Sequence, residues 1–477
     1  MYKKTLLATL LATTCALAGC GGSGGDNSNL PPASSNKPKN VIFFLGDGMG
    51  MTTQTAARIY SQGEDGQLTL DTFTETGFVK TFSNDAQVTD SAPSMAAYMT
   101  GVKMNNEVIS MSTETKAMAP KADLTGNCGT NNGTPVTTLL EIAKAAGMSA
   151  GVVTTTRITH ATPATTYSHV CHRDAENDIA AQLVPAGAGY NGKLLNGVDV
   201  VFGGGRQFFL PTSAGGKRPD GRDLVQEMKV QGYAYASDKA SFDAISSSAD
   251  RAFGLFTSSH MAYDLDRDPA KEPSLAEMTS KAIGILSKNG RGYFLMVEGG
   301  RIDHALHETT AKKALQDTVA FNDAIAAAIK EAKKTDPNLE NTTIVVTADH
   351  DHTLVLNGYA KRTGKTTETN PGVLGLVKDY STGKDAKDAD GMPYSIIGFG
   401  NGENRPAGNR KTFAALTEKG TADATYHQEA AIRTATGSET HGGTDVFIGA
   451  MGKGSDKFHG FMENTKVFSL VREASGL

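Results

Sequence analysis

The richest cluster of reactive side chains in this 477-residue chain follows the apolar run at 294–297. Glu298, Asp303, His304 and His307 fall there within ten residues. Asp303 and His307 are four residues apart, so they share one face of a helix that begins near Asp303. Two ligands at that spacing suit zinc. We interpret this segment as part of a metal site.

A second set of possible ligands lies nearer the C-terminus. Asp349 and His350 follow the apolar run at 343–346 after Thr347 and Ala348, and His441 lies about ninety residues later in Glu-Thr-His-Gly-Gly. Carboxylates and imidazoles are ordinary zinc ligands. The next two residues, Asp351 and His352, are of the same types, and either could be only a neighbour of the site.

Asp47 follows the apolar run at 41–45 within the motif Gly-Asp-Gly-Met-Gly. The glycines permit a tight turn, and the carboxylate can reach a metal. Because Asp-Gly is a common turn, this motif gains meaning only beside the others.

Ser91 follows Asp90 where we expect a helix to begin, since Pro93 is tolerated in the first turn of a helix. The N–H groups and dipole of a helix N-terminus favour a bound phosphate. On this segment alone, a plain helix cap explains the residues equally well.

Two further residues could contact a cation or a phosphate. Thr162, in the polar segment 154–163, offers a hydroxyl to a hard cation. Arg173, farther along, has a planar fork that matches two phosphate oxygens. Either residue could instead be a solvated loop position. Together, the segments supply a serine nucleophile, three histidines and several carboxylates, which is what phosphoryl transfer at paired metals requires.

The elements that position these residues are short strands. Unbroken apolar runs, for example 41–45, 294–297 and 343–346, are typical of strands buried on both faces. Helical stretches separate them, the clearest at 309–334, with one apolar face made by Leu315, Val319, Ala326 and Ile329. We therefore predict a doubly wound, mostly parallel α/β sheet covered by helices, with the ligands at the carboxyl ends of the strands.

In their order along the chain, these segments resemble those of alkaline phosphatases over about residues 41–468. The stretches 154–163 and 297–307 look closer to the animal enzymes than to the familiar enteric bacterial one. The resemblance implies a dimeric enzyme that hydrolyses many phosphate monoesters at alkaline pH. In that family Ser91 would become a phosphoserine and Arg173 would bind the phosphate oxygens. The implied ligands are Asp47, Asp349 and His350 for one zinc ion, Asp303, His307 and His441 for a second, and Asp47, Thr162 and Glu298 for magnesium.

The resemblance also assigns supporting residues. Asp90 would shape the turn before the nucleophile. His160 and His304 occupy positions where some bacterial members have Asp and Lys, so they would lie behind the metal ligands, as in the animal enzymes. The calcium site of the animal enzymes is not carried over, because Thr257 and not Glu follows Phe256.

One departure from the family keeps alternatives open. Ser-x-Pro-Ser from Ser91 is reminiscent of sulfatases, but Met95 stands where those enzymes have the arginine needed to convert the residue to formylglycine. A phosphodiesterase or sulfatase-like hydrolase of the same superfamily is the first alternative. A non-catalytic phosphate-binding lipoprotein is the second, and it requires a lost nucleophile or ligand.

The N-terminus is interpreted as a lipoprotein signal at 1–19, because a basic start and an apolar stretch lead to Leu-Ala-Gly-Cys. The apolar stretch is too short to span a bilayer. Cys20 would be lipidated and 20–40, rich in Gly, Ser, Asn and Pro, would be a flexible tether. The chain would then be exported and anchored on the periplasmic side, at the outer membrane. The catalytic domain would occupy 41–477, with 358–437 as an inserted, crown-like region.

Net charge and cysteine content bear on the partners of the protein and on its disulfide bonding. The net charge is −5 and no basic stripe occurs, so we expect no specific nucleic-acid binding; the membrane would be reached through the lipid alone. Cys128 and Cys171 would remain in an oxidising compartment, where we favour a disulfide over two buried thiols.

Overall fold

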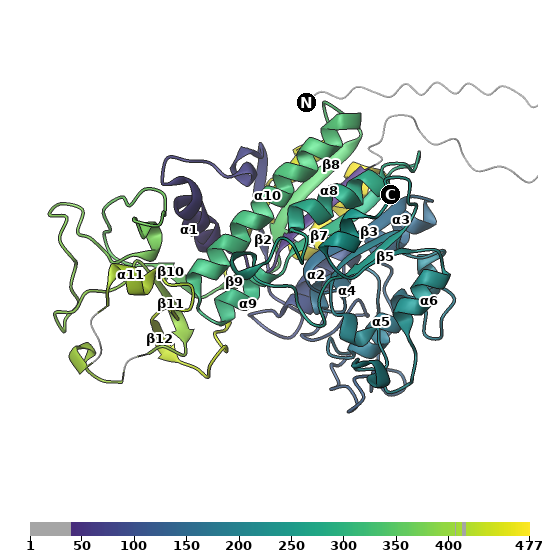
Figure 1. The fold of residues 1–477 in the computed structure, drawn as a ribbon, viewed down its shortest axis with the longest axis horizontal. Coiled ribbons are helices and arrows are strands. Elements are labelled where there is room, and N and C mark those ends of the chain that lie inside the picture. The colour runs from purple at the N-terminus through teal and green to yellow at the C-terminus, as the bar shows by residue number, and fades with distance from the viewer. Residues whose placement is uncertain (1–39, 406, 413–415) are drawn as a thin grey trace, which may run out of the picture. The chain divides into compact units, whose positions relative to one another are not determined.

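The structure, a computed structural model, describes residues 40–405, 407–412 and 416–477 (Figure 1). The predicted signal peptide, the lipidation site at Cys20 and nearly all of the predicted tether lie outside the described residues. Within the described part of the chain, no helix combines the length and the apolar character needed to cross a membrane.

A ten-stranded sheet forms the centre of the fold, in the order β15-β2-β14-β8-β1-β7-β3-β4-β6-β5. Every neighbouring pair is parallel except the two pairs made by β14. The predicted α/β fold is therefore confirmed. The strands are β1 (Asn40–Gly46), β2 (Glu75–Lys80), β3 (Ser149–Arg157), β4 (Val200–Gly204), β5 (Ala234–Ala236), β6 (Ala252–Leu255), β7 (Tyr293–Gly299), β8 (Thr342–Ala348), β14 (Val446–Gly452) and β15 (Gly460–Glu463).

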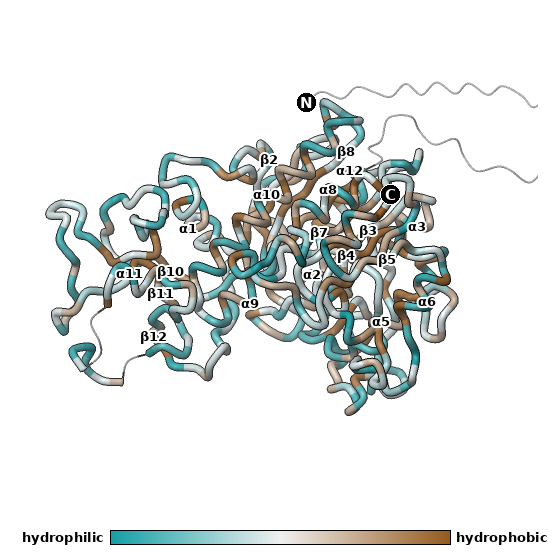
Figure 2. Tube along the Cα trace, in the orientation of Figure 1, coloured by the Kyte–Doolittle hydropathy of each residue, from teal (hydrophilic) through white to brown (hydrophobic). Residues whose placement is uncertain are grey.

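Helices cover the sheet in two layers (Figure 1). All residues of β7 and β8 are buried, as expected for strands covered on both faces, and Figure 2 shows the central strands as the most hydrophobic part of the trace. One layer holds α1 (Met51–Gln62), α8 (Leu275–Leu286) and α10 (Ala311–Thr335), and the other holds α2 (Ser91–Thr100), α3 (Leu139–Ala145), α4 (Ala161–Ala164) and α12 (Asn464–Ser475). The remaining α-helices are α5 (Glu176–Leu183), α6 (Leu224–Val230), α7 (Lys239–Asp243), α9 (Arg301–His307) and α11 (Glu418–Thr421).

The long helix α10 begins and ends close to the predicted boundaries, but its buried face differs from the prediction. Leu315 is buried as predicted, but Val319 and Ile329 are only half-buried and Ala326 is exposed. Asp317 and Asn322 are buried instead. Both polar side chains have main-chain partners: Asp317 accepts from the Asp264 N–H at 3.2 Å, and Asn322 accepts from the Leu70 N–H at 3.2 Å. A pattern based on apolar residues alone misses such positions.

Two small sheets lie outside the central one. β10 (Leu354–Leu356) pairs with β11 (Ile397–Gly402), which pairs with β12 (Ala430–Arg433), so the region 358–437 supplies strands to a sheet of its own. β9 (Asp351–His352) pairs with β13 (His441–Gly442), with His441 opposite His352. This second pairing brings His441 back to the end of β8 across ninety intervening residues.

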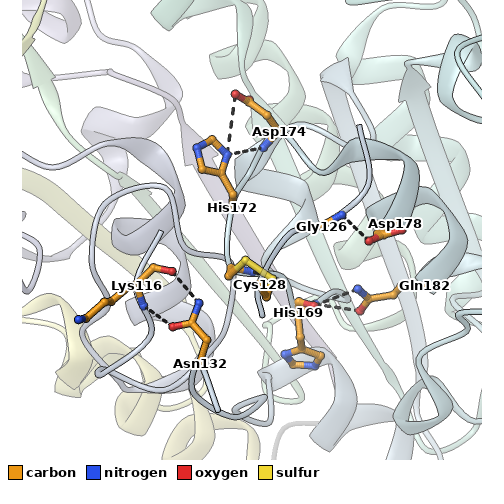
Figure 3. The surroundings of a disulfide bond; sticks show 10 residues. Lys116, Gly126, Cys128, Asn132, His169, His172, Asp174, Asp178 and Gln182 are labelled. Atoms are coloured by element: carbon orange, nitrogen blue, oxygen red, sulfur yellow. Dashed lines mark hydrogen bonds and ion pairs between the residues drawn. A yellow bond between two sulfur atoms is a disulfide. The ribbon is translucent and has the colours of Figure 1, made fainter. Parts of the chain in front are cut away.

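The predicted disulfide between Cys128 and Cys171 is present, with the sulfur atoms 2.03 Å apart (Figure 3). It ties the long loop after α2 to the segment that carries Arg173, two residues after Cys171. Neighbouring hydrogen bonds support the same junction, because Asp178 accepts from the Gly126 N–H at 2.7 Å and Gln182 bonds both main-chain groups of His169. A crosslink over 43 residues stabilises the fold by about 2–4 kcal/mol.

Candidate active site

The register of the central strands brings the predicted ligands together at one edge of the sheet. Gly46, the last residue of β1, pairs with Gly299 of β7 on one side and with Ala348 of β8 on the other. Asp47 and Asp349 are the residues that follow β1 and β8 directly. Because these strands are parallel, their carboxyl ends open to the same edge, where ligands bind in sheets of this type.

The turn after β1 depends on glycine at position 48. Gly48 has φ +65°, and a Cβ there would lie 2.5 Å from the ring of His352. Its N–H donates to Asp349 Oδ1 at 3.0 Å. The glycine-rich motif therefore links the ends of β1 and β8, and it lets the chain pass close to the histidine without a clash.

Ser91 is the first residue of α2 and is 2% exposed. Asp90 caps the helix by accepting from the Ala92 N–H at 2.7 Å. Ser91 Oγ lies 3.3 Å from Asp47 Oδ1 and 3.2 Å from His350 Nε2, so the hydroxyl is aimed into the ligand set. Ser94, the competing hydroxyl, donates to the Asp349 carbonyl at 2.5 Å and has its own structural partner.

Main-chain carbonyls fix the orientation of three predicted zinc-binding histidines. The Nδ1 atom of His350 lies 3.1 Å from the Asp351 carbonyl, and that of His441 lies 2.8 Å from the Thr89 carbonyl. His307 Nδ1 bonds the Glu439 carbonyl in the same way. A proton on Nδ1 leaves Nε2 unprotonated and available to a metal, which is the usual arrangement of metal-binding histidines.

The second predicted zinc set converges on Asp303. Its Oδ1 atom lies 3.3 Å from His307 Nε2 and 3.5 Å from His441 Nε2, and these two nitrogens are 3.1 Å apart. The set is drawn together from α9 and β13. The first set, Asp47, Asp349 and His350, also has ligand atoms within 4.8 Å of one another.

The third set lies between β1, β3 and α4. Leu45, two residues before Asp47, is aligned with Glu298 of β7, which is aligned with Thr154 of β3. Thr162 Oγ1 is 3.5 Å from Asp47 Oδ2. One carboxylate oxygen of Glu298 accepts from the hydroxyls of β3, whereas the other is buried without a hydrogen-bond partner in the described residues.

Buried carboxylates in these sets have raised pKa values and oxygens without hydrogen bonds, and both features favour the binding of cations. Burial, with the carboxylate of Asp47, raises the pKa of Glu298 and of Asp349 well above the usual range. Burial opposes a charged His350, yet Asp349 and Asp47 raise its pKa to about 9. Asp349 Oδ2, like one oxygen of Glu298, has no hydrogen-bond partner within the described part of the chain. Divalent cations would satisfy these atoms and return the carboxylates to their ionised form, so the residues fit the predicted metals.

Arg173 lies beside the nucleophile. Its Nη1 donates to Asp90 Oδ1 at 2.9 Å, and its Nη2 lies 3.1 Å from His160 Nε2. Its main-chain N–H donates to the Glu107 carbonyl at 2.7 Å. The predicted phosphate-binding arginine is therefore held by the residue that caps the nucleophile helix, and the two cannot shift independently.

The sequence left the role of His352 open and gave no role to Glu439. His352 Nε2 lies 2.8 Å from Asp303 Oδ1, and its Nδ1 lies 2.5 Å from Glu439 Oε2. Burial opposes the charged form, but Glu439 and Asp303 raise the pKa of His352 to about 10. Asp351, the other open position, accepts from the hydroxyl of Thr444 and is structural. Only the pairing of β9 with β13 could have revealed the contact with Glu439.

Comparisons with known proteins identify the family to which this chain belongs. The sequence profile described as alkaline phosphatase matches residues 38–477. The alkaline phosphatase of Gadus morhua is 35% identical over 469 residues, covering 92% of each chain. The human tissue-nonspecific isozyme is 35% identical over 468 residues, covering 92% of this chain and 84% of its own.

Solved structures agree in fold. A mutant of the TAB5 alkaline phosphatase, described with Mg bound in its M3 site, has a TM-score of 0.64 at 26% identity over 92% of this chain and 99% of its own. The Thermus thermophilus alkaline phosphatase has a TM-score of 0.65 at 24% identity, covering 93% of this chain and 92% of its own. This chain therefore belongs to the alkaline phosphatase family, whose reaction is the hydrolysis of phosphate monoesters.

Proposed function

We propose that this chain hydrolyses phosphate monoesters through a phosphoserine at Ser91, releasing an alcohol and then inorganic phosphate. The observation that carries the proposal is the position of Ser91 Oγ at the start of α2, 3.3 Å from Asp47 and 3.2 Å from His350. A broad range of small monoesters fits this reaction, because the residues named above all address the phosphate and none addresses the alcohol.

We assign two zinc ions and one magnesium ion to the three sets. When bound, such ions lower the pKa of an attacking oxygen and stabilise the leaving oxygen. The nitrogen and carboxylate donors of the first two sets suit zinc, and the oxygen-only third set suits magnesium. The zinc sets are Asp47, Asp349 and His350, and Asp303, His307 and His441; the magnesium set is Asp47, Thr162 and Glu298.

Each of these residues has a distinct role in the proposed reaction. Ser91 Oγ forms the new bond to phosphorus while the bond to the leaving alcohol breaks, and Arg173 neutralises the non-bridging oxygens. The N–H groups at the start of α2 add a field of about 0.5–2 kcal/mol. Water then attacks the phosphoserine and restores Ser91. Two in-line displacements retain the configuration at phosphorus overall.

Monoesters are favoured over diesters and sulfate esters because a monoester carries more charge to neutralise. Arg173 supplies part of that extra positive charge, and a magnesium ion held by the third set would supply the rest. Met95, fully buried in α2, leaves Ser91 without the arginine that marks conversion to formylglycine. Relative rates on a monoester, a diester and a sulfate ester of the same phenol test this choice, and a faster diester would contradict it.

Arg173→Lys should lower kcat/KM about 10–100-fold, because an ammonium group cannot replace a bidentate fork and a charged hydrogen bond contributes about 1.5–3 kcal/mol. Steady-state kinetics on a simple monoester measure the change. Arg472→Lys on α12 is the matched control and should behave as wild type. Unchanged kinetics in Arg173→Lys would remove this arginine from phosphate binding.

We expect weak magnesium retention at the third set, because His160 and His304 stand where some relatives have Asp and Lys. The double variant His160→Asp/His304→Lys should therefore retain more magnesium after gel filtration in magnesium-free buffer. Elemental analysis before and after the column measures it. Equal retention in the two proteins would show that these residues do not control the third set.

We also propose that the protein is exported and anchored in the outer membrane through a lipid on Cys20, and that it forms a homodimer. The Leu-Ala-Gly-Cys motif ending at Cys20 supports the anchor, and the family supports the dimer. Labelled fatty acid should enter the wild-type protein but not Cys20→Ser. Label in both proteins would mean that the anchor lies elsewhere.

A further inference from the structure

Glu107 lies beside two residues that build the phosphate site, although the reaction proposed above gives it no role. Its main-chain N–H donates to Asp90 Oδ2, and its carbonyl accepts from the Arg173 N–H at 2.7 Å. Asp90 caps the helix that begins with Ser91, and Arg173 is the proposed phosphate-binding residue. The main chain of Glu107 therefore connects the nucleophile helix to the arginine.

The backbone of Glu107 has a conformation that is uncommon for a residue with a side chain. Its φ is +71°, in the left-handed region that glycine, asparagine and aspartate adopt more readily. Such residues persist where the surrounding structure fixes them, and they are concentrated at functional sites. Here the two main-chain hydrogen bonds fix the conformation, and neither of them uses the side chain.

The carboxylate of Glu107 has no partner of its own. Within the residues that the structure describes, it makes no hydrogen bond and no ion pair, because Arg173 is paired with Asp90 at 2.9 Å instead. Burial and Asp90 raise the pKa of Glu107, whereas Arg173 and His172 lower it. The carboxylate is thus within electrostatic reach of the phosphate-binding arginine, and it is ionised at alkaline pH.

An ionised carboxylate in this position opposes the binding of phosphate. A phosphate monoester is a dianion at alkaline pH, and Glu107 repels it. The repulsion is offset when the substrate carries a positive charge of its own, and only the alcohol can carry it. Glu107 is partly exposed whereas Ser91 is buried, so the carboxylate lies on the solvent side of the reacting atoms, where the alcohol extends.

We propose that Glu107 selects phosphate monoesters whose alcohol carries a positive charge, such as the phosphate esters of quaternary amino alcohols. The inference rests on the proposed monoesterase reaction and names a substrate class for it. The exposed carboxylate of Asp174, which also acts on Glu107, adds to the same negative field. Because solvent and salt screen partly exposed charges, the preference is modest and decreases as ionic strength rises.

Two substrates of nearly equal shape test this selection. They are phosphocholine and its uncharged carbon analogue, in which a tert-butyl group replaces the trimethylammonium group. The ratio of their kcat/KM values isolates the effect of the charge. In Glu107→Gln the ratio of the cationic to the neutral ester should fall about 2–10-fold, the scale of one partly exposed charge pair. The inhibition constant of inorganic phosphate should fall as well, because the repulsion is removed.

Two further variants separate charge from structure. Glu107→Asp keeps the charge and suits a positive φ, so its ratio should lie closer to that of the wild type than the ratio of Glu107→Gln does. Glu114→Gln is the matched control, because Glu114 is an exposed residue of the same loop whose carboxylate accepts from Ser112 Oγ at 2.7 Å. It should keep the wild-type ratio.

The wild type alone gives a measurement that needs no variant. Its ratio of the cationic to the neutral ester should decrease as sodium chloride is added, because salt screens an attraction. A ratio that is constant or rises with salt, an equal ratio in Glu107→Gln, or weaker binding of inorganic phosphate in that variant would overturn the proposal. In each of these cases both esters are still hydrolysed. A wild-type enzyme that hydrolyses neither ester would instead contradict the monoesterase reaction on which the inference rests.

Discussion

Ser91→Ala is expected to reduce monoesterase activity by roughly 10³-fold or more, because removal of an enzyme's nucleophile typically lowers the rate by at least that factor. The hydroxyl is the atom that would bond to phosphorus, and alanine cannot replace it. Zinc content should stay near that of the wild type, because Ser91 belongs to none of the three proposed metal sets. Initial rates and elemental analysis on the same preparation measure both quantities.

Ser94→Ala is the matched control, because it removes a hydroxyl from the same helix three residues later. It loses a hydrogen bond to the Asp349 carbonyl and should cost some stability but little activity. A Ser91→Ala enzyme that keeps more than a tenth of its activity would contradict the assignment. A small residual rate is expected, because water within the site can still attack the bound ester.

Removal of the metals should abolish activity, and zinc with magnesium should restore it. All three sets depend on deprotonated donors, for which a chelator competes. Burial and the carboxylate of Asp47 raise the pKa of Asp349 and of Glu298, so bound cations would favour the ionised, metal-binding form of both. Dialysis against a chelator, followed by activity assays during stepwise addition of each metal, measures the effect.

Magnesium alone should not restore the metal-free enzyme, because the zinc sets contain histidine nitrogens and magnesium prefers oxygen. Zinc alone should restore part of the rate. Full activity in protein shown by elemental analysis to be metal-free would contradict the mechanism itself, and recovery with magnesium alone would contradict the zinc assignment.

The sheet and the main ligands could be predicted from the sequence, because each depends on a pattern within a short segment of the chain. Buried parallel strands are continuous apolar runs, and the residue after each run necessarily lies at the carboxyl edge. Asp47 and Asp349 directly follow β1 and β8, and Glu298 lies near the carboxyl end of β7. The helical spacing of Asp303 and His307 likewise places both on one face of α9.

Contacts between residues that are far apart in the sequence could not be predicted from these local patterns. Glu439 reaches His352 only because β13 pairs with β9. His260 meets His304 from a loop after β6 that carries no motif. The buried face of α10 contains Asp317, whose partner is a main-chain N–H 53 residues away. Such polar partners are set by tertiary packing and leave no periodic signal.

Covalent trapping of the intermediate tests the central claim most directly. Brief incubation with a substrate labelled in its phosphate, an acid quench and peptide fragmentation should place one phosphate on Ser91. The acid stops the second displacement and keeps the ester bond intact. Label on Ser94, or inversion of configuration at phosphorus in the complete reaction, would contradict nucleophilic attack by Ser91.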